Sequence, residues 1–500
     1  MLAVSLVQRP QAQEIPMSKS YLRPLWAGGF AVALSGCSMI PTYERPVAPV
    51  PAQWPSTTPA QAADAAVAAA DLPWQDFVQD DRLRQVIALA LEHNRDLRVA
   101  ALSIEQARAQ YQIRRADRTP TVNLAASALR QPATDGSGGM TSSYSVGFAL
   151  ASWEIDFFGR IASLQEAALA QFLATQDARN AAQTSIVAAV SNAWLSLQTT
   201  NALLDLTRQT LATRGDSQRL TQLRFDQGVS SALDLQQAES LSAAARATLA
   251  QQERMRALDL NALMLLTGAP VPASLLPAGG DAAGAQSAAN APQEMTPFAQ
   301  VPSGIPSEVL ARRPDVLQAE QQLLSANANI GAARAAFFPR IALTASAGTA
   351  SSALSGLFKG GSWGWTLAPQ ALLPIFDGGR NQSNLDSARV GRDIALAQYE
   401  KAIQVAFREA ADALGSRATL GEQLSATQAQ ANAEAERFRL ADLRYRNGIA
   451  SYLDVLDAQR SLFATQQAVA QIRLALQQNE VALYKALGGG WREAGEASGG

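Results

Sequence analysis

The chain holds very few residues that could do chemistry. Its 500 residues include one histidine, His93, and one cysteine, Cys37. Metal clusters, disulfide frameworks and Cys/His catalysis all need more of these side chains. His93 ends the stretch IALALEHN, and because a lone imidazole cannot build a ligand shell, we expect a surface helix residue there. No nucleophile and base stand out as a pair, so the sequence predicts no enzyme, no cofactor and no metal site.

Cys37 is the one reactive residue with a specific context. From Met17 the chain reads MSKSYLRPLWAGGFAVALSGC, with Lys19 and Arg23 before a short apolar run that ends in small residues. This pattern is typical of a signal peptide and is too short for a stable membrane span. The last four residues, LSGC, resemble the lipobox of bacterial lipoproteins, in which the cysteine is acylated and the leader is cleaved before it.

The lipobox resemblance predicts a mature chain that starts at Cys37 and is held in lipid by acyl chains such as palmitate. Several acyl chains, at about 0.8 kcal/mol per buried methylene, anchor durably where one would not. Ser38 follows instead of Asp, which by resemblance favours the outer membrane. We therefore expect residues 1–36 to be a signal peptide, with Met17 as the candidate true start. The alternative is a free cysteine in a cleaved leader.

An internal duplication organises the rest of the chain. RLTQLRFDQGVSSALDLQQAE from Arg219 aligns with RLADLRYRNGIASYLDVLDAQ from Arg439, an offset of 220 (439 − 219) that continues without gaps to Gly268 and Gly488. This predicts a tether over 37–73, a first structural repeat over 74–268, a linker over 269–306, a second repeat over 307–488 and a flexible tail over 489–500. The near-neutral charge, 41 basic against 43 acidic residues, argues against a nucleic-acid partner.

Each repeat contains long helical segments. Residues 160–228 hold no proline and one internal glycine, so a continuous helix there would be on the order of 100 Å long at 1.5 Å per residue. Residues 449–487 carry apolar side chains at strict seven-residue spacing, which predicts coiled-coil packing. These residues are Val455, Leu462, Val469, Leu476 and Leu483. Gly228 and Gly448 each end a long helix, as expected at the tip of a helical hairpin.

Each repeat also contains two segments that alternate like strands, within about 120–155 and about 340–376. Trp363 and Trp365 lie two apart, on one face. This alternation is the weak signature of outer-membrane strands, and a soluble half-buried hairpin is the alternative. Four strands cannot close around a lumen, whereas three chains would supply twelve. The sequence therefore predicts an α+β membrane protein with long coiled-coil hairpins and four transmembrane strands per chain, assembled as a trimer.

Several motifs in the same order resemble the TolC-like outer-membrane factors, and more closely their lipoprotein (NodT/OprM-like) branch. They are WQDFVQDDRLRQVIALALEHN from Trp74, RRPDVLQAEQQL from Arg312, AAFFPRIAL from Ala335, IFDGGR from Ile375 and LRYRNGIASYLDVLDAQ from Leu443. The resemblance implies a homotrimer with a twelve-stranded barrel, a twelve-helix periplasmic tunnel and an equatorial domain built partly from the linker and the C-terminal region.

The resemblance also implies a function. It is that of a passive outer-membrane duct, lipid-anchored and extending into the periplasm, that exports small molecules or drugs as part of a tripartite efflux system. Its partners would be a periplasmic adaptor and an inner-membrane pump of the resistance-nodulation-division type. The alternatives are the duct of a type I protein secretion system and a lipid-tethered helical scaffold.

The aperture residues are carried over from the same resemblance. A periplasmic carboxylate ring falls on Asp454 and Asp457, six carboxylates in a trimer, which would favour cations. Asp234 is the one acidic equivalent in the first repeat, since Gln237 replaces the other. The alternative is that Asp454 and Asp234 only cap the helices that follow the turns.

Two further residues precede the second turn and are expected to lock it. Tyr445 and Arg446 are placed to bond neighbouring helices. The best-known relative has an arginine just after the tip glycine, where this chain has Ala450, so Arg446 is the expected substitute. Gly228 and Gly448 mark the tips that would contact the adaptor.

Overall fold

The computed structural model describes residues 38–51, 54, 72–132, 139–279, 296, 298–300 and 307–491. The expected signal peptide, Cys37 and most of the linker lie outside the described residues. Two compact units divide the chain: Met1–Thr42, Ile113–Glu166 and Asn327–Arg389 make the first, and Tyr43–Gln112, Ala167–Ala326 and Val390–Gly500 the second. Each unit contains segments of both repeats, so the duplicated halves are interleaved.

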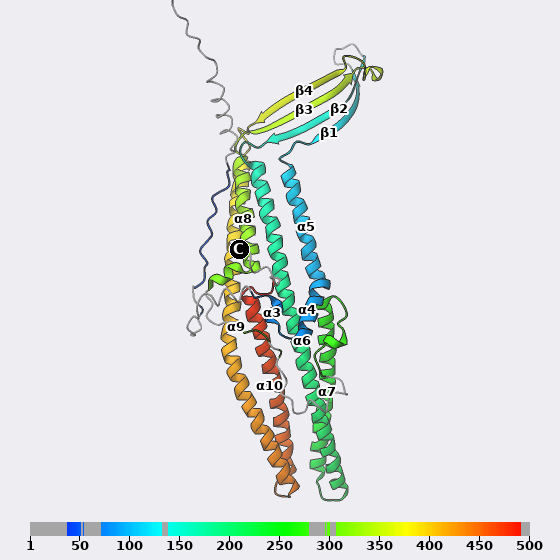
Figure 1. The fold of residues 1–500 in the computed structure, drawn as a ribbon, viewed down its shortest axis with the longest axis vertical. Helices are drawn as coiled ribbons and strands as arrows, with labels where there is room; N and C mark the ends of the chain where they lie inside the picture. The colour runs from blue at the N-terminus through cyan, green and yellow to red at the C-terminus, as the bar shows by residue number, and fades with distance from the viewer. Residues whose placement is uncertain are drawn as a thin grey trace, which may run out of the picture. The chain divides into compact units, whose positions relative to one another are not determined.

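The first unit contains one antiparallel sheet with the strand order β1-β2-β3-β4 (Figure 1). Its strands are β1 (Val122–Pro132), β2 (Met140–Ile155), β3 (Arg340–Ser351) and β4 (Trp363–Leu372). Two hairpins, one from each repeat, are joined through β2 and β3, and β1 and β4 each have a single paired neighbour among the described residues. The prediction of four strands per chain is confirmed.

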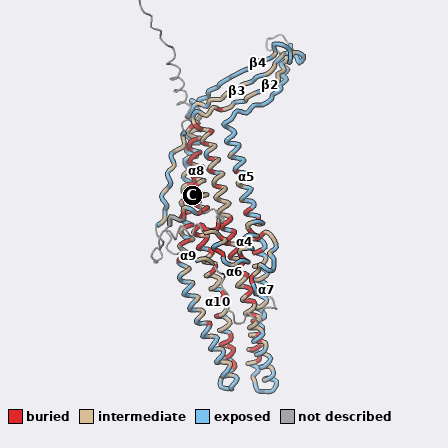
Figure 2. The backbone as a smooth tube through the Cα atoms, in the orientation of Figure 1, coloured by how far each residue is buried: buried red, intermediate tan, exposed pale blue. Residues whose placement is uncertain are grey.

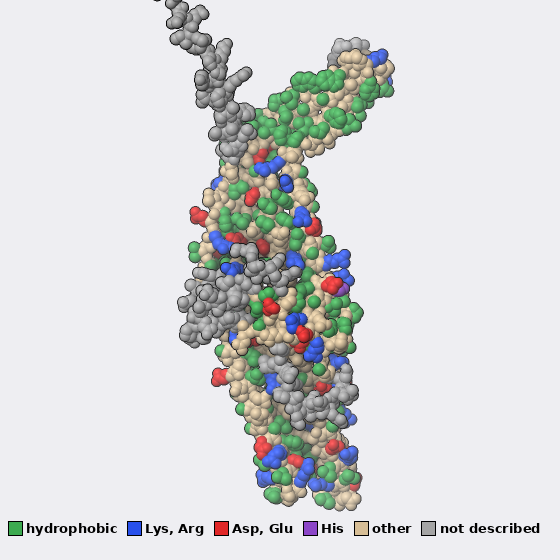
Figure 3. Space-filling model, viewed as in Figure 1, with side chains coloured by type: hydrophobic (Ala, Val, Ile, Leu, Met, Phe, Trp, Pro, Cys, Tyr) green, Lys and Arg blue, Asp and Glu red, His purple; other side chains and the backbone are tan. Residues whose placement is uncertain are grey.

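The two faces of the sheet differ sharply. On one face Leu124 lies opposite Phe148, which lies opposite Ala347 and then Trp365. On the other face the neighbouring row is small and polar and consists of Asn123, Ala149, Ser346 and Thr366. Side chains on the displayed side of the strands are largely hydrophobic (Figure 3). Such dyad alternation is typical of strands that face lipid.

Glycines let two of the strands approach closely at the centre. A Cβ on Gly147 would lie 2.5 Å from the carbonyl oxygen of Ala347, and one on Gly348 would lie 2.3 Å from that of Val146. A larger residue at either position would push β2 and β3 apart. The pairing that joins the two hairpins therefore depends on these two glycines.

Long helices form two hairpins, α6–α7 and α9–α10. Helices α6 (Arg160–Asp226) and α9 (Arg380–Arg446) have 67 residues each, and α7 (Ala232–Thr267) and α10 (Tyr452–Ala486) return from them (Figure 1). The expected continuous helix from residue 160 is therefore confirmed. Of the heptad positions in α10, Val455, Val469 and Leu483 are buried and the two leucines between them are half-buried. Among the described residues, none of the helices is both long and apolar enough to cross a membrane.

Shorter helices surround the middle of the second unit. They are α3 (Trp74–Phe77), α4 (Asp81–His93), most of α5 (Arg95–Ala116) and the first part of α8 (Pro314–Ala335). Asp80 caps α4 by accepting hydrogen bonds from the backbone N–H groups of Arg82 and Leu83. His93 lies in the last turn of α4 with 41% of its side chain exposed, as expected of a surface helix residue.

The core of the second unit joins distant parts of the sequence. The rings of Phe77 and Tyr484 stack with their centroids 3.9 Å apart, and Phe298 stacks on Phe77 at 5.0 Å. Trp194 of α6 is fully buried in the same cluster. Buried residues concentrate at this level of the helices (Figure 2). The N-terminal segment, a described piece of the linker and the C-terminal helix thus share one core.

A buried arginine holds the end of α10 to this core. Arg313 is 4% exposed, and its guanidinium bonds Asp315, Glu409 of α9 and the carbonyl oxygen of Ala486. The side chains of Asp315 and Glu409 are 41% and 34% exposed, so water partly screens both ion pairs. Arg313 lies in the RRPDV motif, whose sequence alone does not reveal that role.

The segment after Cys37 is fixed to the helices by side chains. The Tyr43 hydroxyl and the Arg45 guanidinium both donate to the buried carboxylate of Glu320 on α8. In the first unit, Asn327 donates to the carbonyl oxygen of Pro41 at 2.8 Å. The first residues of the expected tether therefore lie along α8 in a defined conformation.

The carboxyl of Asp177, near Glu320, predicts that the stability of the protein depends on pH. Burial, and then the charge of Glu320, raise the pKa of Asp177 on α6 to about 6. Since the folded pKa exceeds the unfolded one, the ionised form opposes folding above pH 6, and stability is gained as the pH falls through 6. We expect Asp177→Asn to stabilise the protein by about 1 kcal/mol at pH 7.5, because this half-buried site is partly screened by water.

The measurement is the melting temperature of the detergent-solubilised protein between pH 5 and pH 8. Wild type should melt at a lower temperature above pH 6, and Asp177→Asn should flatten that part of the curve. Asp216→Asn, an exposed carboxylate on the same helix, is the control. A wild-type curve that Asp177→Asn leaves unchanged would contradict the assignment.

Candidate functional site

The tips of the two hairpins are built alike. Gly228 and Gly448 have φ angles of +71° and +73°, and the N–H groups of Val229 and Ile449 each donate to a carbonyl oxygen five residues earlier, at 2.8 and 2.9 Å. This is the glycine-dependent way to end a helix. Both glycines that the sequence analysis singled out thus lie in the turns between paired helices.

Serine, and not aspartate, caps the helix after each turn. The Ser231 hydroxyl accepts from the backbone N–H of Asp234, whose carboxylate accepts in return from the N–H of Ser231, so α7 begins with a capping box. Ser451 accepts from the N–H of Asp454 at 3.4 Å. Asp234 is therefore engaged in local hydrogen bonds, whereas Asp454 is exposed and has no ion-pair partner among the described residues.

Arg224 makes a polar contact between the two hairpins near their tips. Arg224 of α6 donates a hydrogen bond to the Tyr445 hydroxyl of α9, and its guanidinium lies 5.0 Å from the centre of the same ring. The Tyr445 ring packs at a tilt against the ring of Tyr452 of α10, with 5.2 Å between their centroids. Tyr445 of α9 thus contacts α6 through Arg224, a residue that the sequence analysis did not identify.

A small apolar cluster supports that contact. Ala238 of α7 packs with Tyr452, Val455 and Leu456 of α10, and Phe438 of α9 lies against them. Burial raises the pKa of the Tyr452 hydroxyl. We refer to the Arg224–Tyr445 contact together with this cluster as the tip joint.

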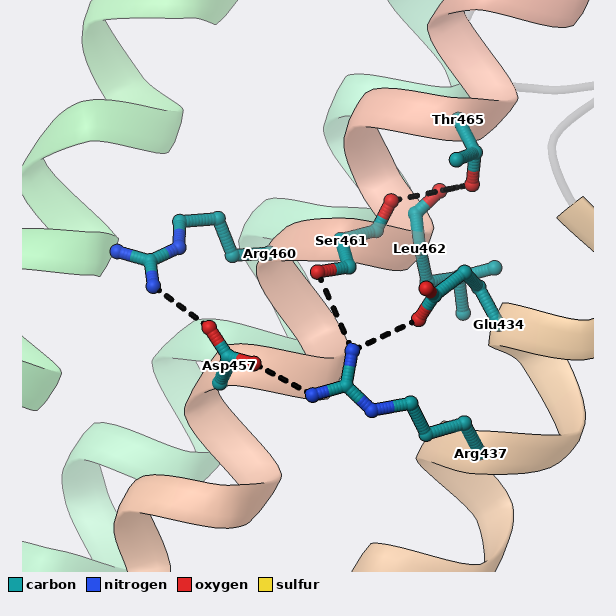
Figure 4. A network of polar contacts seen from close by, with 7 residues as sticks. All are labelled: Glu434, Arg437, Asp457, Arg460, Ser461, Leu462 and Thr465. Carbon is teal, nitrogen blue, oxygen red and sulfur yellow. Dashed lines mark hydrogen bonds and ion pairs between the residues drawn. The ribbon is translucent and has the colours of Figure 1, made fainter. Parts of the chain in front are cut away.

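The Asp457 carboxylate is paired with two arginines of its own hairpin (Figure 4). One carboxylate oxygen accepts from Arg437 of α9 and the other from Arg460, one turn further along α10, at 2.7 Å. Arg437 also donates to Glu434 at 3.1 Å and to the hydroxyl of Ser461 at 3.4 Å. The bonds from Arg460 and Arg437 lower the pKa of the Asp457 carboxyl, so it stays ionised and paired.

These contacts change the expected charge of the aperture. Asp457 does not act as a free carboxylate, because two guanidinium groups hold it. Arg446 pairs with Asp442 of its own helix at 2.8 Å, so in the described chain it does not bond a neighbouring helix. Only Asp454 keeps the free, exposed carboxylate that the expected ring requires.

Each tip also presents the same exposed apolar pair. Val229 is 76% exposed and its equivalent Ile449 is 69% exposed, while Leu233 and Leu453 are 67% and 56% exposed. Apolar side chains this exposed, repeated at equivalent positions, indicate a contact surface. The offset of 220 residues could have revealed the pair, because both members recur in the alignment.

The described residues do not form a metal site. No group of three or more His, Cys, Asp or Glu side chains within the described ranges is placed to hold a metal ion. The functional features are instead the two-faced sheet, the long hairpins and the joined tips. This combination is that of an outer-membrane channel subunit.

The chain belongs to the outer membrane efflux protein family, whose model matches residues 86–269 and again 305–489. It is 46% identical over 471 residues to the probable efflux pump outer membrane protein TtgC of Pseudomonas putida, covering 93% of this chain and 94% of that protein. Over 468 residues it is 46% identical to the outer membrane protein OprJ of Pseudomonas aeruginosa, covering 93% and 95%. The expected resemblance to this family is therefore confirmed.

Solved structures agree with this placement. A membrane protein from Pseudomonas aeruginosa superposes with a TM-score of 0.81 at 44% identity, covering 91% of this chain and 98% of the other. The open state of the MtrE outer membrane channel of Neisseria gonorrhoeae gives 0.80 at 38% identity, covering 91% and 99%. The fold is thus shared with outer membrane channels over nearly its whole length.

The tip joint generates a prediction about local stability. Arg224→Ala removes both the hydrogen bond to Tyr445 and the cation–π contact, together worth about 1 kcal/mol at a partly exposed site. We expect the backbone amides of residues 447–456 to exchange with deuterium about five times faster, measured by mass spectrometry.

The matched control is Arg219→Ala, on the same helix. In the described part of the chain, Arg219 pairs with Asp216 of its own helix alone and is exposed, so its loss should leave the second tip unchanged. Equal exchange in the two variants would show that Arg224 does not hold the hairpins together.

Proposed function

We propose that this protein is the outer-membrane duct of a tripartite efflux system, a passive homotrimeric channel that exports small organic molecules. The observation that carries the proposal is the four-stranded sheet with one apolar and one polar face and two edge strands, β1 and β4. In lipid these edges need partners, because a bilayer offers none to backbone N–H and C=O groups. Three copies supply twelve strands around a polar lumen.

The relatives suggest the class of cargo. Proteins 44–46% identical to this chain, all from Pseudomonas putida, are named as outer membrane components of toluene, solvent and antibiotic efflux pumps. Small apolar and amphiphilic compounds are therefore the proposed cargo. The duct itself selects by size and charge, and the pump supplies the energy.

The exposed residues at the tips and the cysteine Cys37 suggest which partners the protein binds. The exposed apolar pairs at the tips, next to Gly228 and Gly448, are the proposed contact for a periplasmic adaptor, which joins the duct to an inner-membrane pump of the resistance-nodulation-division type. Cys37 is the proposed lipid attachment that keeps the N-terminus at the outer membrane. Tyr43 and Arg45, bound to Glu320, then leave only a short span of chain between the lipid and the body.

The proposed aperture is formed by the tips. Its charge comes from one ring of three Asp454 carboxylates, because Asp457 is paired with Arg437 and Arg460. The tip joint holds the aperture closed. A duct of this kind needs no nucleophile or cofactor, since the working groups are those that narrow and charge the bore.

Dye efflux tests the function directly. Cells that lack the gene should accumulate more of a cationic fluorescent dye than cells that carry it on a plasmid with its own adaptor and pump. A variant with Leu233→Asp and Leu453→Asp should reach the membrane in normal amount but fail to restore efflux, because charge replaces the apolar contact surface. Equal accumulation in deleted and complemented cells, for the dye and for toluene, would contradict the proposal.

The revised charge of the aperture gives a second prediction. In planar bilayers with a KCl gradient, Asp454→Asn should reduce the preference for cations, since it removes the ring of free carboxylates. Asp412→Asn, an exposed carboxylate of α9 distant in sequence from the tip, should leave the reversal potential unchanged. If Asp454→Asn also leaves it unchanged, the ring does not lie in the ion path.

A further inference from the structure

A buried arginine lies where the first hairpin meets α10. Arg214 of α6 is 5% exposed. Its guanidinium donates to the carbonyl oxygen of Leu241 on α7 at 3.1 Å and lies 5.2 Å from the centre of the Phe463 ring on α10. Arg214 precedes Arg224 by ten residues on the same helix, about 15 Å at 1.5 Å per residue.

The charge of Arg214 is compensated only in part. Among the described residues no carboxylate pairs with it, and its Nε has no hydrogen-bond partner. Burial alone lowers the pKa of the guanidinium.

The second hairpin has a different arrangement of charges at the equivalent position. The residue equivalent to Arg214, 220 positions later, is Glu434, which joins the network of Arg437, Asp457 and Arg460 (Figure 4). Two carboxylates and two guanidinium groups balance there at the exposed side of the hairpin. In the first hairpin, the buried cation Arg214 lies instead against the ring of Phe463 on the other hairpin.

We propose that Arg214 opposes closure of the aperture, acting as a buried cation whose incomplete compensation favours separation of α10 from the first hairpin. The proposal rests on the duct function proposed above. A guanidinium loses hydration when it is buried, and one carbonyl oxygen and one ring replace that hydration only in part. When α10 moves away, water reaches Arg214 and the cost is relieved.

The two contacts between the hairpins then act in opposite directions. The hydrogen bond that Arg224 donates to the Tyr445 hydroxyl stabilises the closed tip, whereas Arg214 makes the closed tip less stable than an apolar side chain would. The balance sets how readily a partner can open the duct. Arg214 is therefore a positioning residue for gating and is not part of the ion path.

The test measures single-channel open probability of the purified full-length protein in planar bilayers. Tyr445→Phe removes the hydroxyl that accepts from Arg224 and should raise the open probability. Arg214→Met keeps the length of the side chain and removes its charge. Added to Tyr445→Phe, it should lower the open probability about tenfold, as expected when a buried charge is replaced by an apolar group. Arg214→Lys keeps the charge and should not lower the open probability.

A second variant makes the test independent of that substitution. Phe463→Leu removes the ring that faces Arg214 and should raise the open probability in the wild-type chain, but much less in the Arg214→Met chain, as a double-mutant cycle would show. Two results would overturn the proposal. One is that Arg214→Lys lowers the open probability as strongly as Arg214→Met does. The other is that Phe463→Leu has an equal effect in the wild-type and Arg214→Met proteins. Absence of any channel current, even in Tyr445→Phe, would instead count against the duct function.

Discussion

The unpaired edges of a four-stranded sheet are the constraint on which the rest of the structure depends. Each repeat supplies one hairpin of strands, and the pairing of β2 with β3 joins the two into a sheet that cannot close on itself. One face is lined by Leu124, Phe148 and Trp365, and the opposite face by small polar side chains. Such a sheet is stable in lipid only when other copies pair with β1 and β4.

In the duct proposed above, weak contacts at the helical tips would hold the aperture shut without chemistry. The contact between Arg224 and Tyr445 is partly exposed, and contacts of this kind are worth about 1 kcal/mol each. Weak contacts suit a gate, because the binding energy of a partner at the tips can overcome them. More strongly compensated groups, such as Arg313 with Asp315 and Glu409, lie in the second unit away from the tips in sequence.

The sequence predicts the regular parts of this fold well. The duplication and the absence of proline indicate two helices of equal length, and α6 and α9 have 67 residues each. Alternating residues around Trp363 and Trp365 indicate strands, because the period of two is visible without any partner. The turns at Gly228 and Gly448 are likewise predictable, since only glycine adopts that backbone conformation at low cost.

The pairing of individual charges was not predictable in the same way. Asp457 appeared as a free ring carboxylate because its partner Arg437 is 20 residues away and faces it only when the rotation of both helices is known. Arg446 was expected to bond a neighbouring helix, but it forms an ion pair with Asp442, one turn away on its own helix. The contact of Arg45 with Glu320 joins residues 275 positions apart, which no local pattern reveals.

The most direct test of the central claim is the mass of the intact particle after gentle extraction in detergent, measured by native mass spectrometry on the full-length protein. The account predicts three copies of the chain, held together when the helical tips are destabilised by Arg224→Ala, because the strands provide the closure. A folded protein that remains monomeric in conditions that preserve its sheet would contradict the account.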